Sequence, residues 1–557
     1  MIMKPSFFLV LLIILHTKHH LFACLDDEID LANNFHSEKS QNIELDNDVI
    51  SSDSGTHILV FGGGYSASGN QVSLESNVKY FHKIMNNLNL NDTLKYTLFA
   101  DGNDSARDLQ FFDPKYKVPK INEILAELFG NPKTIYHQYR SNKLNLNGPS
   151  SSEMINRWFD RRKNSNQSDQ NIIYFTGHGG KGDTKKPHNT TAYLWSNSRL
   201  KVSDFVKKLD QLPIEQSTFV IMVQCYSGGF ANIIFEDGDP QKKFSNHSRA
   251  GFFSTIQSRV AAGCTPDIRE ENYQEYSTSF WEALSGVSRI GDKVNRPDYN
   301  GDGYTSLMEA HSYVCIHSET IDIPIKTSDV LLRKYVGNSP TSSQENEKNK
   351  NFFEKYIPKI FSQDNNSTKL SKRIEGITKK EFEQYAQPEE KAVLSALLKK
   401  LEINGEYPIK EITKLSEKLK KEKGQIEKEK KKHTDNKNKH RDTLRKRLKK
   451  IYPELVNPYH PVVSNLFQIA EKQKILDMIN RDDLWKNLLN EKKEIQKFES
   501  QKFLIEKKEA KVIRTRRCLE NIFFTKILLQ QGSDDEKKNF RKLQNLERTI
   551  PSKSWKN

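Results

Sequence analysis

Short apolar runs alternate with amphipathic stretches between residues 56 and 337. Four of the apolar runs have the length and composition of buried strands, at 57–64, 96–102, 171–177 and 219–224. Stretches with apolar residues at helical spacing lie between and after them, at 73–88, 120–130, 152–164, 202–212 and 276–287. Strands that are apolar throughout, with helices between them, indicate a mostly parallel sheet covered by helices on both faces. The pattern therefore predicts an α/β domain over residues 56–337.

A different pattern starts after residue 337. Residues 338–352 are polar and are predicted to form a linker, whereas residues 353–557 place Lys, Glu, Leu and Asn in long helical stretches. The proline-marked segment 452–463 separates two helical blocks. We expect this Lys-rich region to form an elongated helical hairpin or bundle. The apolar positions follow no clean heptad repeat, so a coiled coil is left open.

The first 24 residues form a short basic start, an apolar run too short to span a bilayer, and a polar end. This is the pattern of a signal peptide, and it indicates export, either secretion or delivery to a bacterial cell envelope. The segment "LFAC" resembles a lipobox, in which Cys24 would carry a lipid anchor, and ordinary cleavage near Ala23 is the alternative. Residues 25–55 are rich in Asn, Ser and Asp and are predicted to be a flexible linker.

The net charge of +15 is unevenly distributed. Residues 410–450 hold 18 Lys and Arg against 7 Asp and Glu, so this segment alone carries 18 − 7 = +11. Nucleic acid or anionic lipid can bind such a segment, but a mixture of Lys and Glu is more typical of a solvated helix face, so a nucleic-acid partner is not favoured. Five cysteines in 557 residues exclude a disulfide framework, and leave open whether Cys264 and Cys315 pair.

Two of the predicted strands end in glycine-rich turns that carry reactive side chains. "FTGHGG" places His178 after one strand, and "VQCYSGG" places Cys225 after another. Because the carboxyl ends of parallel strands meet at one edge of a sheet, we expect both side chains at the same rim. A cysteine becomes a nucleophile when a nearby base takes its proton. Attack on an amide also needs N–H donors for the oxyanion, and the glycine turn supplies one at Gly179.

This combination resembles the clan of cysteine peptidases that includes legumains, caspases, metacaspases and gingipains, in which a His-Gly turn follows one strand and a cysteine follows the next. The resemblance covers about residues 57–320. It implies a caspase-like α/β fold and cleavage of peptide bonds in a protein or peptide substrate. It also implies His178 as general base or ion-pair partner, Cys225 as nucleophile, and the N–H groups of Gly179 and Cys225 as oxyanion hole.

Two positions beside the cysteine depart from the pattern of this clan. Gln224 directly precedes Cys225, where caspases proper have an intervening Ala. Val223 stands where legumains and metacaspases have an acidic residue that lines the pocket for the first substrate side chain. The resemblance therefore implies neither a preference for aspartate nor one for Arg, Lys or Asn.

Residues 298–309, "DYNGDGYTSLME", fit the template of a calcium-binding loop with Gly303 at the bend. The predicted ligands are the side chains of Asp298, Asn300, Asp302, Ser306 and Glu309 and the carbonyl of Tyr304. The alternative is a surface turn in which Thr305 or Ser306 caps the following helix. We expect a bound Ca²⁺ that stabilises the fold, since exported proteins meet this ion at high concentration.

The loop "GGGYSA" after the first strand spells a dinucleotide fingerprint, but the next acidic candidate, Asp101, follows Gly62 by 101 − 62 = 39 residues. A ribose contact needs an acid after about 20 residues, so we expect no nucleotide. The sequence thus predicts an exported cysteine endopeptidase with a calcium-stabilised, caspase-like domain and a helical extension. The alternative is a catalytically inactive, caspase-like binding or scaffold protein whose basic helical tail engages a partner or an anionic surface.

Overall fold

The computed structural model describes residues 55–87, 95–165, 169–338, 374–457, 462–463 and 469–550. The predicted signal peptide with Cys24 lies outside these residues, as do both predicted linkers apart from residues 55 and 338. In the described ranges, no helix combines the length and the apolar character needed to cross a membrane.

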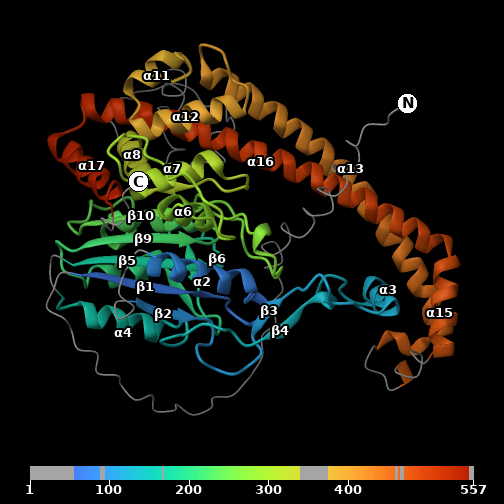
Figure 1. Cartoon of the computed structure of the whole chain (residues 1–557). Helices are drawn as coiled ribbons and strands as arrows, with labels where there is room; N and C mark the ends of the chain where they lie inside the picture. The colour runs from blue at the N-terminus through green and yellow to red at the C-terminus, as the bar shows by residue number, and fades with distance from the viewer. Residues whose placement is uncertain are drawn as a thin grey trace.

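A six-stranded sheet in the order β11-β10-β9-β5-β1-β2 forms the centre of the α/β domain (Figure 1). Its strands are β1 (Thr56–Gly63), β2 (Lys95–Phe99), β5 (Gln170–Gly177), β9 (Ser217–Val223), β10 (Arg249–Phe253) and β11 (Ile325–Lys326). All neighbouring pairs are parallel except β10 and β11. The predicted α/β fold class is confirmed, and the four predicted strands are β1, β2, β5 and β9. The short strands β10 and β11 extend the sheet beyond the prediction.

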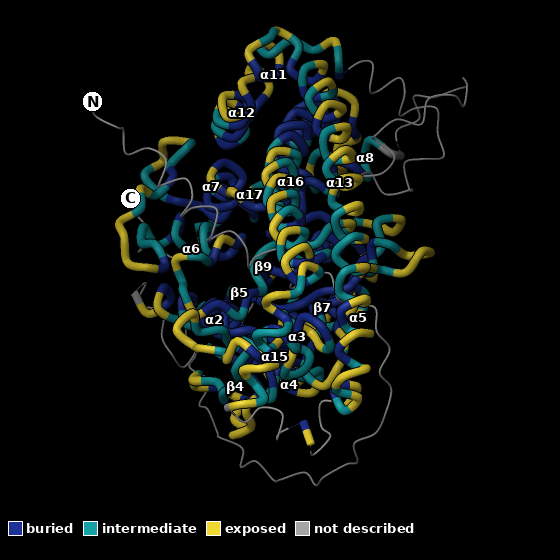
Figure 2. Tube along the Cα trace, turned by 90° about the vertical axis from the view of Figure 1, so that its right-hand side faces the viewer, coloured by how far each residue is buried: buried dark blue, intermediate teal, exposed yellow. Residues whose placement is uncertain are grey.

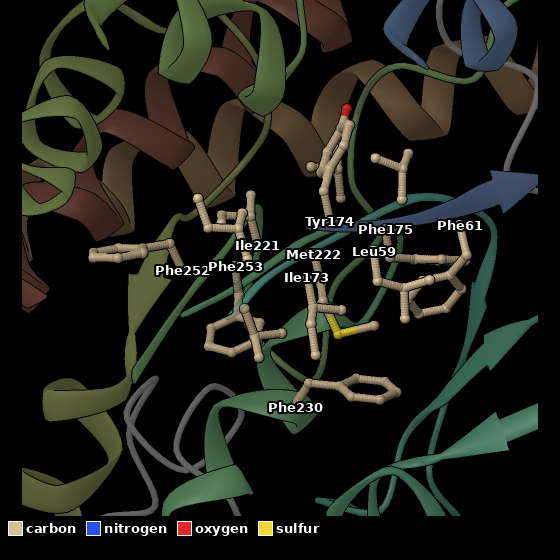
Figure 3. Packing of buried hydrophobic residues seen from close by; sticks show 14 of the residues in the cluster. Leu59, Phe61, Ile173, Tyr174, Phe175, Ile221, Met222, Phe230, Phe252 and Phe253 are labelled. Atoms are coloured by element: carbon tan, nitrogen blue, oxygen red, sulfur yellow. The ribbon is translucent and has the colours of Figure 1, made fainter. Parts of the chain in front are cut away.

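Helices cover both faces of the sheet. On one face lie α2 (Val72–Asn87), α6 (Tyr276–Ser285) and α7 (Leu307–His317), and on the other lie α4 (Ser152–Arg162) and α5 (Val202–Leu209). Tyr174 of β5 packs against Phe81 and Trp281 at ring-centroid distances of 5.1 and 5.3 Å. Figure 3 shows Tyr174 and Phe230 on opposite sides of the strands. Because successive side chains of a strand alternate, β5 has to be apolar throughout to bury both faces.

Local sequence signals start several helices. The Ser151 side chain accepts a hydrogen bond from the Met154 N–H at the start of α4. The helix α7 begins with a reciprocal capping box between Ser306 and Glu309, which satisfies N–H groups that a first helical turn leaves unpaired. A residue of this kind before an apolar periodic run fixes a helix start locally, which is why these starts follow from the sequence.

Smaller elements surround the sheet. A three-stranded sheet consists of β6 (Gly179–Gly180), β7 (Thr191–Tyr193) and β8 (Arg199–Lys201). The described short helices are η2 (Ala67–Gly69), η4 (Thr134–Tyr136), η5 (Ser227–Ile234), η6 (Glu236–Gly238), η7 (Glu270–Asn272) and η9 (Pro453–Val456).

Two long helices, α13 (Pro408–Ile451) and α16 (Asp483–Gln531), form a hairpin. Lys423 of α13 pairs with Glu506, Lys430 with Glu499, and His433 with Glu491. The residue numbers of the partners on α16 fall as the residue numbers on α13 rise, so the two helices are antiparallel. The predicted hairpin is therefore confirmed. The other described tail helices are α11 (Lys379–Tyr385), α12 (Pro388–Lys400), α15 (Ile469–Arg481) and α17 (Asp534–Glu547).

The base of the hairpin packs on the sheet domain. An apolar cluster joins α7 and α8 (Thr327–Asn338) to α11, α12, α13 and the C-terminal half of α16. Within it, the buried Arg514 donates to the backbone carbonyls of Cys315, Ser318, Thr320 and Asp322. Figure 2 shows the strands mainly as buried, and α13 as mainly intermediate or exposed.

The far end of the hairpin also contacts a part of the sheet domain. Residues 109–140, here called the α3 arm, form a two-stranded ribbon of β3 (Leu109–Phe111) and β4 (Gln138–Arg140) that carries α3 (Lys120–Phe129). Figure 1 shows α3 lying beside α15 at the tip of the hairpin. The contact is a separate apolar cluster of Ile121, Ile124, Leu128, Leu444, Leu448, Ile475, Ile479, Trp485 and Leu488. The hairpin is thus attached to the sheet domain at both ends.

Candidate active site

His178 and Cys225 lie at the ends of neighbouring strands. Thr176 of β5 is opposite Val223 of β9 in the parallel register, and each reactive residue follows two positions later. The backbone segments that follow the two strands approach closely, because a Cβ atom on Gly179 would lie 2.2 Å from the carbonyl oxygen of Cys225. The structure therefore brings the three predicted residues to one edge of the sheet.

The loop between β1 and α2 holds the His178 ring. Its Nε2 atom lies 2.8 Å from the Gly69 carbonyl oxygen and 2.9 Å from the Gln71 Oε1 atom. The Tyr65 ring packs against it edge-on at 5.4 Å, and His178 is only 7% exposed. A carbonyl oxygen can only accept a hydrogen bond, so Nε2 carries the proton and Nδ1 has the lone pair of the neutral ring. This tautomer presents Nδ1 as the basic atom.

Asn70 fixes the loop that holds His178. Its Oδ1 atom accepts from the Gly64 N–H at 3.0 Å, and its Nδ2 atom donates to the Asp108 carboxylate at 2.9 Å. The Asn70 carbonyl accepts from the Gln110 N–H of β3 at 2.8 Å. Asn70 is fully buried, so these bonds are shielded from water. The α3 arm thereby begins at the strand that supports the loop of His178.

Two carboxyl groups lie next to this support. Burial raises the pKa of Asp108, against the opposing effect of the Asn70 hydrogen bond. Burial, together with the charges of Asp108 and Asp104, raises the pKa of Asp101 to about 7. Burial is thus the main cause of both shifts, because it disfavours the charged form of a carboxyl group, and the charge of Asp108 adds to the shift of Asp101.

The segment that follows β10 crosses the cysteine. The Ala261 N–H donates to the Cys225 Sγ atom at 3.3 Å, and the Tyr226 N–H donates to the Arg259 carbonyl at 2.8 Å. Cys225 is 6% exposed. A backbone N–H directed at sulfur favours the thiolate over the thiol, because it stabilises the negative charge.

Two buried acidic residues contact the backbone of this segment at Ala262 and Gly263. The Asp322 Oδ1 atom accepts from the Ala262 N–H at 2.7 Å, and burial raises the pKa of Asp322 to about 6. Burial also raises the pKa of Glu275 to about 7, although the Arg289 guanidinium lies 3.5 Å away. A Cβ atom on Gly263 would lie 2.3 Å from a Glu275 carboxylate oxygen, so the backbone of the segment packs directly on this acid.

Sequence reasoning missed the residues that support the dyad. Gly69, Gln71 and Ala261 act through backbone or side-chain contacts with residues far away in the chain, and no local pattern marks them. The "GGGYSA" loop, set aside as a nucleotide motif, leads into the segment that holds His178. From the sequence, Gln224 stands out only because it directly precedes Cys225, where caspases have an intervening Ala. Its side-chain amide is buried, and within the described residues neither polar atom has a hydrogen-bond partner.

The predicted calcium loop closes through hydrogen bonds to its own backbone. The Asp298 carboxylate accepts from the N–H groups of Gly301, Asp302 and Gly303. The Asp302 carboxylate accepts from the Tyr304 N–H at 2.9 Å and from the Asn300 side-chain amide at 2.8 Å. The oxygen-bearing side chains of the first half of the loop therefore converge on one turn.

Glu309, at the twelfth position of this loop, folds back onto it. Its Oε1 atom accepts from the Tyr299 N–H at 2.7 Å, and its Oε2 atom accepts from the Ser306 N–H at 2.9 Å. The alternative that Ser306 caps the helix is confirmed. Among the described residues, no group of three or more His, Cys, Asp and Glu side chains has the arrangement of a metal site. Calcium binding stays a prediction.

Among the described residues, Cys225, Cys264, Cys315 and Cys518 form no disulfide with one another, so Cys264 and Cys315 do not pair.

Comparison with models of protein families, and with curated protein sequences, finds no match. Among solved structures, the chain is similar to caspase-1 from Spodoptera frugiperda at 10% sequence identity and a TM-score of 0.26. The similarity covers 55% of this chain and 88% of the caspase. A likeness at this TM-score does not carry the assignment of fold or function, and the fold class rests on the sheet order and register described above.

Proposed function

We propose that the protein is a cysteine peptidase that cleaves peptide bonds with Cys225 as nucleophile and His178 as general base. The observation that carries the proposal is the placement of both residues at one rim with the His178 Nε2 atom held by the Gly69 carbonyl. The resemblance of the turns "GHGG" and "QCYSGG" to the legumain and caspase clan supports it.

In this mechanism the His178 Nδ1 atom takes the thiol proton, and the Ala261 N–H steadies the thiolate. The sulfur attacks the carbonyl carbon, and the oxyanion accepts from the N–H groups of Gly179 and Cys225. The imidazolium then gives its proton to the leaving amine as the C–N bond breaks. Water, deprotonated by His178, hydrolyses the acyl-enzyme and restores the thiol.

The proposal includes two features predicted from the sequence alone. One is a Ca²⁺ ion in the loop 298–309, supported by the convergence of oxygen-bearing side chains on one turn. The other is export through the N-terminal 24 residues, which lie outside the described residues. Protein or peptide chains are the proposed substrates.

The alternative of an inactive scaffold draws on the Lys-rich helices. Within the hairpin, Lys423, Lys430 and Lys502 form ion pairs with glutamates of the opposite helix. Part of the basic charge therefore stabilises the hairpin itself instead of facing a partner. The peptidase proposal is favoured because it accounts for the supported His178 ring and the N–H donated to Cys225.

Labelling with a thiol-directed electrophile tests the proposal. We expect rapid labelling of the full chain, loss of labelling and of peptide-library hydrolysis in Cys225→Ala, and slowed labelling in His178→Ala. Cys264→Ala is the matched control, because Cys264 is a free and more exposed thiol near the same strand end. Unchanged hydrolysis by Cys225→Ala would show that the proposal is wrong.

A further inference from the structure

A continuous series of contacts leads from Cys225 to the base of the hairpin. The Ala261 N–H donates to the Cys225 sulfur, and the adjacent Ala262 N–H donates to the Asp322 carboxylate. The Asp322 carbonyl in turn accepts from the Arg514 Nε atom of α16 at 3.0 Å. The C-terminal half of α16 is therefore connected by hydrogen bonds to the segment that crosses Cys225.

A second series leads from His178 to the hairpin tip. Gln71, which accepts from the His178 ring, forms a bridge with Gln110 of β3. This strand starts the α3 arm. At the end of the arm, Glu127 of α3 pairs with Lys492 of α16 at 2.5 Å and with Lys437 of α13 at 3.9 Å. The two series therefore meet on the same helix.

Together these contacts close a frame around the candidate site. Arg514 and Lys492 are 514 − 492 = 22 residues apart on α16, and a helix of that length spans about 33 Å. Over this span α16 forms ion pairs with α13, through Lys430–Glu499 and Lys502–Glu427. Figure 1 shows the hairpin and the α3 arm leaving the sheet domain at different places and meeting at the far end.

Figure 1 shows β6, which directly follows His178, at the end of the sheet that faces the hairpin and the α3 arm, so the rim with His178 and Cys225 lies on the inner side of this frame. A compact domain of 100 residues has a radius of gyration of about 13 Å, which corresponds to a sphere about 34 Å across. Such a body is about as wide as the distance along α16 between Lys492 and Arg514, the two points at which this helix is attached. An extended chain with its side chains needs only about 10 Å. His178 and Cys225 are also nearly buried, so a substrate has to reach into the rim to contact them.

We propose that the frame formed by α16, the α3 arm and the sheet domain selects extended, locally unfolded polypeptide segments as substrates and excludes compact folded domains. This inference rests on the proposed peptidase activity. It assigns a role to the helical region that does not depend on its net charge: the hairpin and the arm restrict access to the site by their size and by their contact at the tip.

The frame is closed by a contact that one substitution can open. Ile124 of α3 is fully buried in the apolar cluster at the tip, so a carboxylate there has no partner and is strongly destabilising to the contact. Asn122 lies on the exposed side of the same helix. Ile124→Asp and Asn122→Asp therefore add the same charge to α3, and only the first disrupts the tip.

The experiment uses the full chain and three substrates that share one cleavable sequence, chosen from a peptide library. They are a short fluorogenic peptide, a small domain with the sequence in a surface turn, and the same domain unfolded by core substitutions. We expect the wild type and Asn122→Asp to cleave the peptide and the unfolded domain. The native domain should be cleaved only through its unfolded population, at least about 100-fold more slowly for a stability of about 3 kcal/mol.

Ile124→Asp should cleave the native domain nearly as fast as the unfolded one, with the peptide rate unchanged. Leu448→Asp opens the same contact from the hairpin side and replaces Ile124→Asp if that variant does not fold. Equal cleavage of native and unfolded domains by the wild type overturns the inference and leaves the peptidase intact. The inference is also overturned if hydrogen exchange shows that the tip contact has opened in a variant, and that variant still does not cleave the native domain. Failure to hydrolyse even the peptide contradicts the proposed function instead.

Discussion

At the level of single residues, the candidate site depends on where the proton of His178 lies. The Gly69 carbonyl fixes that proton on Nε2, and the position of Gly69 depends on the Asn70 side chain, which bonds to Gly64 and Asp108. The buried Asn70 side chain thus accepts a hydrogen bond from Gly64 and donates one to Asp108. Substitution by Asp keeps the shape of the side chain and the bond from Gly64 but removes the donor to Asp108.

Asn70→Asp is expected to lower kcat by about tenfold or more, because a carboxylate facing Asp108 loses a buried hydrogen bond, a cost of about 1–3 kcal/mol. Asp108→Asn should have a small effect, since a rotated amide at position 108 still accepts from Asn70. The double variant reverses donor and acceptor and should recover most of kcat. The measurement is kcat per titrated active site, with the pH profile of kcat/KM.

Asn145→Asp, at an exposed position, is the control for that change and should leave both quantities unaltered. A role in folding alone would change the melting temperature but not kcat per active site. Retention of the wild-type kcat and pH profile by Asn70→Asp would contradict the support assigned to this residue.

Glu275 gives a pH dependence of stability. Burial raises its pKa from 4.5 to about 7 in the folded protein. Between these values the unfolded chain releases the proton and the folded chain keeps it, so Glu275 lowers stability as the pH rises through this window. The loss amounts to at most about 3 kcal/mol. Glu275→Gln removes this dependence, so its stability relative to wild type should rise between pH 4.5 and pH 7 and stay level above.

Urea unfolding at pH 5 and pH 8 measures this difference. Glu153→Gln changes an exposed carboxylate of α4 in the same way and should show a much smaller pH dependence. If Glu275→Gln and wild type differ by the same free energy at both pH values, Glu275 does not hold a proton in the folded state.

At the level of elements, the start of α7 combines a helix cap with part of the predicted calcium loop. Its capping box uses Ser306 and Glu309, which are also the last two predicted calcium ligands. The Glu309 carboxylate already reaches the N–H groups of Tyr299 and Asn300. The proposed Ca²⁺ site would require this side chain to shift from its capping position toward the ion.

We expect Ca²⁺ to raise the melting temperature over that in a chelator, because an ion at 100 times its Kd adds about 2.7 kcal/mol. Asp302→Ala should remove this response without breaking the capping box, in which Asp302 takes no part. Asp292→Ala, an exposed acid just before the loop, should retain the response. The measurement is thermal unfolding with Ca²⁺ and with chelator, and identical melting temperatures for the wild type would refute calcium binding.

At the level of the whole molecule, the helical region is joined to the sheet domain by buried polar groups as well as by apolar contacts. Arg333 of α8 pairs with Glu520 at 3.1 Å, and the buried Glu547 of α17 accepts from Ser328. Arg514 alone satisfies four carbonyls that precede β11. Buried polar groups of this kind are costly to separate, so the hairpin base should stay attached in solution.

Arg514→Ala should destabilise the protein by about 3–5 kcal/mol, because it leaves buried acceptors without a donor. It should also raise hydrogen exchange in residues 315–322 and lower peptide cleavage, since Asp322 supports the segment that crosses Cys225. Arg541→Ala, which changes an exposed arginine of α17, should alter none of these three quantities. Unchanged exchange in Arg514→Ala would show that the base is held by apolar contacts alone.

The sequence by itself determined the features that depend on local order. The strands β1, β2, β5 and β9 and the helices between them follow from the pattern of apolar positions, because burial of a face imposes that pattern on neighbouring residues. The long helices of the tail follow from the sequence as well, but it left open whether they form a hairpin or a bundle. The positions of His178 and Cys225 follow too, since each comes directly after such a strand.

The tertiary structure decided the features made by contacts between distant segments. The strand β11 has only two residues and is defined by its pairing with β10, which the sequence pattern did not reveal either. Asn70, Ala261 and Asp322, which support the candidate site, act through a few individual hydrogen bonds, most of them to residues far away in the chain, and such bonds leave no repeating signal in the sequence. The contact between α3 and the hairpin tip joins two helices that were each predictable, but which face meets which depends on the length of the α3 arm and on the path of α16.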